Sequence, residues 1–570
     1  MNSAKILQQR AEKTAQLYSD PHNPRLHLER ALLHEKLGFP DLAAADAYRA
    51  LSLLESVIDP DGSEFHARKK LDSSAADGRV PTSNADVDNE DQDEDDEEDD
   101  GTIPVTQEEY NTLIGDVYSV FVRSLVQCGC YRDAYEFGVR GRQLLHELAT
   151  PSDDNDHTSA LSSAAADVLS DQLENIKQVY KTRTNCTETD LHSIDPSLLP
   201  AQGFARRVLY PWNEHEPDRN SPEKLHVLNE RLSKVAPKCE VRAVALPALR
   251  DTDSPTPDSN EVSVQLGLFA KEDIAPDEII LRESSLLTAT NRLHDDICDA
   301  CHAPLPDLSD PNPPVACDGG CADTIFCSQD CHDAAQNVYH GAICGLEDGL
   351  ESIGKDIPDP KDKADYLYLL LLGRALAMSA TQDVHALDLP EVQYIWGDFH
   401  ETATLPFSFQ LNILQPMRLL EEMELDPYAL LEKFDTWVLN TLYAKFRGTA
   451  SGRLSTWDGG PEVCAVHPLW CLANHSCDPN VRWEWGGEIT FRARTADEKP
   501  VWERNFKGVH QTRPAGSGGI GANVEILNHY CDIGLDVKQR REWACGALGG
   551  MCRCQRCLWE AGEVENVGDS

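Results

Sequence analysis

The chain has 570 residues, 41% of them hydrophobic, which is enough for two to four domains with buried cores. Its formal net charge is −46, from 51 basic and 97 acidic residues. Nucleic-acid affinity comes mainly from Lys and Arg contacts to phosphates, so this balance argues against direct DNA binding and favours a basic protein partner.

We expect neither secretion nor a membrane-spanning segment. The N-terminus lacks an apolar segment, and the most apolar run, 366–372, is far shorter than the ~20 residues that a membrane helix needs. Many of the nineteen cysteines form closely spaced pairs. This spacing predicts zinc thiolates in a reducing compartment, the nucleus and/or the cytoplasm, and not a disulfide framework.

The first region, 1–58, predicts a helical hairpin. Residues 23–55 read as helix, Gly-Phe-Pro break and helix, and the turn and small-residue spacing recur in 110–145. Small residues that fit both halves are Ala31, Gly38, Ala43, Ala50, Gly129 and Ala134. The pattern resembles tetratricopeptide (TPR) repeats, which implies TPR-like helices in 1–58 and, with a linker, in 107–235. A generic pair of helical hairpins would leave the same pattern.

An acidic segment, 59–106, separates these two helical regions. It is rich in Asp, Glu, Ser and Pro, and 86–100 alone contains 12 acidic residues without any Lys or Arg. Such a segment buries too little apolar surface to offset the entropy of ordering, so we expect disorder. A second polar stretch, 150–159, predicts a surface loop.

Short strands are predicted in 239–297, around Gly267-Leu268-Phe269-Ala270 and Asp273 to Leu281. This stretch resembles the N-terminal half of a SET domain, and the resemblance implies that Gly267, Leu268 and Phe269 contact the methyl donor. Two residues depart from the family pattern. Gln265 occupies the place of a first glycine, and Asp277 occupies the place of a turn glycine.

The segment 298–344 contains four closely spaced ligand pairs, seven cysteines and one histidine in all. This number satisfies two tetrahedral structural Zn²⁺ sites. The spacing resembles a MYND finger, which implies alternating pairs: Cys298, Cys301, Cys327 and Cys331 on one ion, and Cys317, Cys321, His340 and Cys344 on the other. Spacing alone leaves sequential pairing open. His302 and His332 are expected at the surface.

The segment 345–450 reads as mainly helical and resembles the helical insert of SET-MYND proteins. Asn440 lies where such proteins often have an asparagine that contacts the cofactor. A helix-capping role would suit Asn440 equally well.

The catalytic half is predicted in 451–535. Asn474-His-Ser-Cys-Asp-Pro-Asn480 resembles the NHSCxPN signature of SET-domain methyltransferases, and Trp483 to Arg494 predicts a hairpin turning at Gly486-Gly487. Glu525 to Asp532 matches the family's E-I-x-x-x-Y-x-D pattern. The resemblance implies that Asn474 and His475 contact S-adenosylmethionine and that Tyr530 is the active-site tyrosine. Between these stretches, 495–523 is predicted as a surface loop.

The final region, 536–570, contains a C-x-C-x2-C cysteine trio. It resembles a post-SET module, which implies that Cys477, Cys552, Cys554 and Cys557 hold a third zinc ion. Cys545 is a competing ligand.

These predictions combine into a multidomain α+β protein with N-terminal helical repeats. A SET core is split by the MYND finger and the helical insert, and a post-SET zinc module ends the chain. The resemblance implies a SET-MYND protein-lysine methyltransferase with S-adenosylmethionine and three Zn²⁺ ions, acting on a histone or other basic segment. The alternative is an inactive zinc-stabilised adaptor that binds peptides through its TPR-like and MYND regions.

Overall fold

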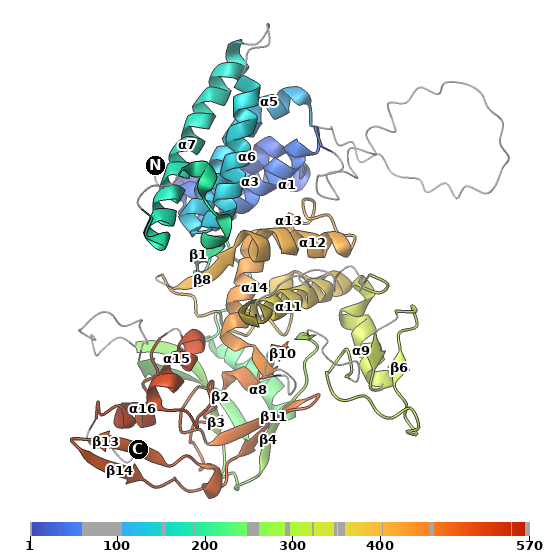
Figure 1. Ribbon diagram of the computed structural model, residues 1–570. Helices are drawn as coiled ribbons and strands as arrows, with labels where there is room; N and C mark the ends of the chain where they lie inside the picture. The colour runs from blue at the N-terminus through green and yellow to red at the C-terminus, as the bar shows by residue number, and fades with distance from the viewer. Residues whose placement is uncertain are drawn as a thin grey trace, which may run out of the picture. The chain divides into compact units, whose positions relative to one another are not determined.

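The computed structural model describes residues 3–59, 105–149, 156–186, 190–247, 262–290, 297–321, 324–346, 350, 360–401, 403–454, 461–548 and 550–564. The chain divides into two compact units (Figure 1). The first contains Met1–Arg206 and Thr404–Leu439, and the second contains Arg207–Ala403 and Asn440–Ser570. None of the described helices is both long and apolar enough to cross a membrane. The predicted disordered segment, 59–106, falls almost wholly outside the described residues.

Helices dominate the first unit. They are α1 (Ser3–Ser19), α2 (Pro24–Lys36), α3 (Pro40–Glu55), α5 (Gln107–Cys128), α6 (Tyr131–Ala149) and α7 (Asp156–Thr184). Asn23 caps α2, and Gly38 and Gly129 adopt φ values of +78° and +87° in the turns between helices. The two predicted hairpins are therefore present as α2–α3 and α5–α6, whereas the end of the predicted loop 150–159 already belongs to α7.

The segment Thr404–Leu439 completes the first unit. Its strand β8 (Thr404–Ser408) pairs with β1 (Gln202–Arg206), and it continues through a π-helical turn, η5 (Gln410–Leu414), α12 (Gln415–Glu422) and α13 (Leu431–Phe434). The Phe409 ring lies 4.8 Å from the Tyr48 ring, 5.6 Å from Phe121 and 5.4 Å from Phe137. The aromatic core of the helical region is thus filled by a residue from within the predicted insert 345–450.

Buried charges hold the same segment to α2 and α3. Arg30 is fully buried and contacts Asp46 at 2.6 Å and Asp435 at 3.0 Å. Arg49 also contacts Asp435, at 3.6 Å, and approaches Thr436 Oγ1 at 3.2 Å. Two guanidinium groups therefore compensate two buried carboxylates.

Small antiparallel sheets build most of the second unit. β2 (Cys239–Pro247) pairs with β3 (Val262–Ala270), while β11 (Val481–Trp485), β12 (Ile489–Ala493) and β4 (Ile279–Glu283) form a three-stranded sheet. A further sheet contains β5 (Thr288–Thr290), β10 (Pro461–Ala465) and β9 (Ser451–Leu454). α8 (Pro222–Val235) packs on β2. The predicted hairpin 483–494 is present as β11–β12, and Gly487 turns it with a φ of +100°.

The cysteine-rich segment carries β6 (Val315–Ala316), β7 (Ile325–Phe326), α9 (Gln329–Val338) and η3 (His340–Ala342). It packs on α11 (Pro360–Gln382), which is followed by η4 (Ala386–Asp388). Tyr339 donates a 2.6 Å hydrogen bond to Asp299, and the Arg374 guanidinium lies 3.5 Å from the centre of the Tyr339 ring. The Arg374 contact joins the segment to α11, and the Tyr339 hydrogen bond lies within the segment.

The region 495–523 is not the surface loop that the sequence predicts. It contains η7 (Ala496–Glu498) and a hairpin of β13 (Trp502–Phe506) and β14 (Val509–Arg513). Arg504 is buried, donates to Trp559 O and Val564 O, and lies 4.2 Å from the centre of the Trp559 ring. Its role is therefore to anchor the hairpin to α16 (Gln555–Glu560), which follows α15 (Val537–Leu548).

Candidate active site and metal centres

The residues predicted to contact the methyl donor come from three segments that are distant in the sequence but adjacent in the fold. Asn474 Nδ2 donates to Leu266 O at 3.1 Å and to Glu525 Oε1 at 2.7 Å. A Cβ on Gly267 would lie 2.7 Å from Glu525 Oε1 and 3.2 Å from Asn474 Nδ2. Only glycine fits at this crossing without displacing its neighbours.

The other predicted donor-side residues lie nearby or on a separate helix. Leu268 is buried, and Phe269 forms an isolated antiparallel bridge with Glu525. Asn440 is buried within α14 (Thr436–Thr449), past the first turn. Asn440 therefore does not cap a helix end, and Asp435 instead accepts from Thr436 N at 2.8 Å.

The two residues that depart from the family pattern differ in backbone conformation. Gln265 pairs with Val244 in the regular β2–β3 ladder, so its extended backbone does not require glycine. Asp277 has a φ of +65°, the left-handed conformation that a turn glycine would supply. Arg482 Nη2 lies 3.1 Å from the Asp277 carboxylate and holds it in this turn.

The heptapeptide 474–480 and the stretch 525–530 run side by side. Ser476 N donates to Asn528 O, and Asn528 N donates to Asn474 O, both at 2.8 Å. The Asn480 amide reaches two further backbone groups, Glu525 O at 2.7 Å and Leu527 N at 2.8 Å. This pairing brings Tyr530 next to the heptapeptide.

Tyr530 makes two hydrogen bonds at this crossing. Its hydroxyl donates to Ala473 O at 3.0 Å, and its backbone N–H donates to His475 Nδ1 at 3.0 Å. Burial raises the pKa of the Tyr530 phenol well above its usual value, with a smaller contribution from Cys471. The side chain is therefore neutral and can both donate and accept a hydrogen bond.

Glu283 supports the backbone that leads into the heptapeptide. Its carboxylate accepts from Leu469 N at 3.0 Å and from Trp470 N at 2.7 Å. Burial raises the pKa of Glu283 to about 7, although the two N–H groups oppose the shift. This buried carboxyl holds the start of η6 (Trp470–Leu472), just before Asn474.

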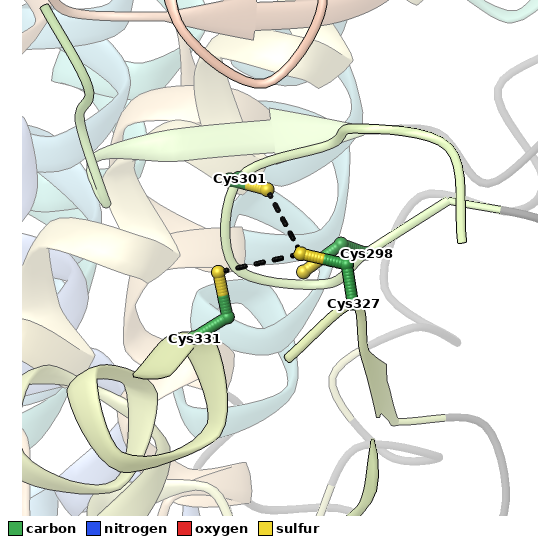
Figure 2. Close-up of side chains that lie close together, drawn as sticks. All are labelled: Cys298, Cys301, Cys327 and Cys331. Atoms are coloured by element: carbon green, nitrogen blue, oxygen red, sulfur yellow. Dashed lines mark hydrogen bonds between the residues drawn. The ribbon is translucent and has the colours of Figure 1, made fainter. Parts of the chain in front are cut away.

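Two groups of ligand atoms assemble in the cysteine-rich segment. Figure 2 shows the sulfurs of Cys298, Cys301, Cys327 and Cys331 directed toward one another. The second group comprises Cys317, Cys321, His340 and Cys344, whose potential ligand atoms all lie within 4.8 Å of one another. The spatial grouping is the alternating one. Cys301 and Cys327 are 3.7 Å apart, and Cys317 Sγ lies 3.1 Å from His340 Nε2.

A third group lies at the C-terminal end and contains Cys477, Cys552, Cys554 and Cys557. Cys477 Sγ is 3.4 Å from Cys557 Sγ and 4.0 Å from Cys552 Sγ. Sulfurs on a tetrahedral zinc with 2.3 Å bonds lie about 3.8 Å apart, so the donor set and its spacing fit Zn²⁺. Four protein ligands would leave no open position, as in a structural site.

The sequence-based prediction did not include Cys531, which lies next to this third group. Cys531 is buried, and its sulfur lies within 4.8 Å of both Cys477 Sγ and a ring nitrogen of His475. Among the described residues, Cys545 belongs to none of the groups that can hold a metal ion. Spacing could not reveal this, because Cys531 reaches the site only through the pairing of 525–530 with the heptapeptide.

Two histidines outside the ligand groups differ from their predicted position. His302 and His332 are buried, not at the surface. His332 Nδ1 lies 2.9 Å from Asp333 Oδ1, and its ring packs edge-on against Phe326 at 5.4 Å.

A comparison with protein-family models matches residues 265–498 to the SET domain. No curated protein matches the chain. The match includes Gly267, Asn474 and Cys477 but ends before Tyr530 and the C-terminal cysteines, which the fold brings to the same place. The segment 265–498 is therefore similar to the SET domain, a family that generally comprises protein-lysine methyltransferases.

Proposed function

We propose that the protein is an S-adenosylmethionine-dependent protein-lysine N-methyltransferase of the SET-MYND type. The observation that carries this proposal is the crossing of three segments, where Asn474 lies beside Gly267 and the Tyr530 hydroxyl donates to Ala473 O. The match of 265–498 to the SET domain supports it independently. The chemistry below follows from the groups present at this crossing.

The donor would supply an electrophilic methyl group on a sulfonium. Glu525 lies beside Gly267 and Asn474, and burial raises the pKa of its carboxyl above the usual value. A cation bound there would favour the carboxylate form, so the site offers a negative group to a cationic donor.

Tyr530 would orient the substrate amine. Its hydroxyl proton is engaged by Ala473 O, so the phenol oxygen retains lone pairs for an amine N–H. Lysine has a reference pKa of about 10.4, and a desolvated site favours the neutral amine that attacks the methyl carbon. The N–C bond forms as the C–S bond breaks, so alignment of the three atoms is the main catalytic contribution.

Zinc would serve structure and not chemistry in this protein. All three groups offer four protein ligands, and backbone N–H groups donate to two of the thiols, Gly319 N to Cys317 Sγ at 3.3 Å and Gly345 N to Cys321 Sγ at 3.2 Å. Such hydrogen bonds favour the thiolate form that zinc requires.

The substrate we propose is a basic protein segment, such as a histone tail, because the chain carries a net charge of −46. We place the protein in the nucleus or cytoplasm because its cysteine groups suit zinc in a reducing compartment. The alternative function is an inactive zinc-stabilised adaptor, which predicts that no methyl group is transferred.

The decisive test is incorporation of radiolabelled methyl groups from S-adenosylmethionine into whole-cell lysate proteins. We expect Tyr530→Phe to lower incorporation about 10²-fold, since a misplaced amine loses alignment. Tyr110→Phe is a matched control, because the Tyr110 hydroxyl is buried without a hydrogen-bond partner. Equal incorporation by wild type and Tyr530→Phe, or none by either protein, would contradict the proposal. Thermal stabilisation by S-adenosylmethionine checks that the donor binds.

A further inference from the structure

The side chain of His475 joins the active-site tyrosine to the C-terminal metal group. His475 Nδ1 accepts from the backbone N–H of Tyr530 at 3.0 Å, and His475 Nε2 lies 3.4 Å from Cys477 Sγ. His475 and Tyr530 also contact through their rings, whose centres are 5.2 Å apart. Both nitrogens of one imidazole are therefore engaged, one on each side.

These contacts fix the tautomer of His475. A backbone N–H can only donate, so Nδ1 must present its lone pair to Tyr530 N. A neutral imidazole carries one proton, which then lies on Nε2 and points toward the Cys477 sulfur. A protonated Nε2 cannot bind a metal. His475 is thus excluded as a ligand even though its nitrogen lies close enough to be one.

We propose that His475 is a positioning residue that donates an N–H···S hydrogen bond to the zinc-bound thiolate of Cys477 and accepts from Tyr530 N–H. The zinc ion thereby stabilises the backbone position of the active-site tyrosine. This inference rests on the zinc site of the proposed function. It assigns the His475 side chain a role separate from contact with the methyl donor.

The hydrogen bond has a definite electronic effect. An N–H donor withdraws charge from the thiolate and fixes its orientation, and loss of such a partner of a metal ligand typically lowers metal affinity about 10- to 100-fold. Arg540 approaches a second sulfur of the same group, with Nη2 3.9 Å from Cys557 Sγ. Two different sulfurs of the group, those of Cys477 and Cys557, therefore each have a side-chain N–H group close by.

The test compares three substitutions in the full-length protein. His475→Phe keeps a planar ring but removes both hydrogen bonds, whereas His475→Gln retains one acceptor and one donor. His529→Phe is the matched control, because His529 Nδ1 contacts Cys531 O at 3.1 Å and its ring stacks on Trp483, without touching a metal-group thiol in the described structure. Circular dichroism checks the fold of each variant.

Metal analysis first counts the zinc ions bound to the wild type. The Cys554→Ser variant should bind one ion fewer, which identifies the ion of the C-terminal site. Competition with a chromophoric chelator then measures the affinity of that site. We expect His475→Phe to lower it about 10- to 100-fold, His475→Gln to recover part of the loss, and His529→Phe to match the wild type. Equal affinity in His475→Phe and wild type, or equal losses in the Phe and Gln variants, would overturn the proposal.

Two further readouts separate this role from general destabilisation. In cobalt-substituted protein, loss of the N–H donor should move the thiolate-to-metal charge-transfer band to lower energy in His475→Phe. Hydrogen exchange at the Tyr530 amide should become faster in the same variant. An unchanged band and an unchanged exchange rate would contradict the inference, as would loss of one whole zinc ion, which would identify His475 as a ligand.

The outcomes also distinguish this inference from the proposed function. Wild-type protein with only the two ions of the cysteine-rich segment would remove the C-terminal zinc site and the inference together. If the wild type binds three zinc ions and His475→Phe does not change the affinity of the C-terminal site, the inference is overturned but the methyltransferase proposal stands.

Discussion

At the scale of single residues, the site depends on groups whose partners come from distant parts of the sequence. Gly267 is required because Glu525 and Asn474 approach it, and Glu283 acts on backbone N–H groups almost 190 positions away. The sequence motifs predicted which residues would matter at the donor side. They did not predict the contacts, since these depend on how the segments cross.

Glu283 makes stability depend on pH. Its pKa is about 7 in the folded protein and about 4.5 when unfolded, so its stabilising effect is full below pH 4.5 and is lost as pH rises through 7. The shift corresponds to roughly 3 kcal/mol at pH 8. We therefore expect the difference in melting temperature between Glu283→Gln and the wild type to shift in favour of the variant as pH rises from 5 to 8. A difference that stays constant over this range would refute the assignment.

Gln265 is the residue at which the family pattern fails. Because its backbone is regular strand, Gln265→Gly should not improve donor binding. It should lower stability by about 0.5–1 kcal/mol, since glycine loses more conformational freedom on folding. Calorimetric titration with S-adenosylmethionine and a thermal melt measure the two effects. A several-fold tighter binding would show that the glutamine side chain obstructs the donor.

At the scale of secondary-structure elements, local patterns predicted the helices and hairpins well. The α2–α3 and α5–α6 pairs and the β11–β12 hairpin follow from apolar spacing and turn glycines. The β13–β14 hairpin was missed because its apolar residues are few and its stability comes from Arg504 on Trp559. A sequence pattern does not contain such a long-range anchor.

The same limit applies to the segment 404–439. Its residues read as part of a single helical insert, but Asp435 is buried against Arg30 and Arg49. Burial opposes ionisation of Asp435, and these two guanidinium groups nevertheless hold its pKa below the usual value. The charge network, and not the helical pattern, determines where this segment belongs.

Asp435→Asn should therefore be strongly destabilising. Removing one partner of a buried ion pair leaves an uncompensated charge, which costs about 3–5 kcal/mol. Asp426→Asn is the matched control, because Asp426 pairs with His22 at 2.8 Å but is 25% exposed, and it should cost about 0–1 kcal/mol. Urea unfolding followed by circular dichroism compares the two. Equal losses would argue against the buried network.

At the scale of the whole molecule, thiol spacing predicted that metal ligands cluster in 298–344 and near the C-terminus, whereas the alternating grouping and the inclusion of Cys477 came from the family resemblance. The division into two units could not be predicted from sequence, because both units contain chain from two separate stretches. Periodicity reports which face of an element is apolar, but not which domain covers that face.

This interlacing has a consequence for fragments of the protein. The chain passes between the units after Arg206, Ala403 and Leu439, so removing residues 1–206 would not remove an independent domain. It would leave Phe407, Phe409 and Tyr428 without the helices that bury them. We expect the fragment 207–570 to aggregate alone and to become soluble when 1–206 is co-expressed as a separate chain. A monomeric, soluble 207–570 would disprove this expectation, whereas recovery would mean that two gene pieces can reassemble one protein.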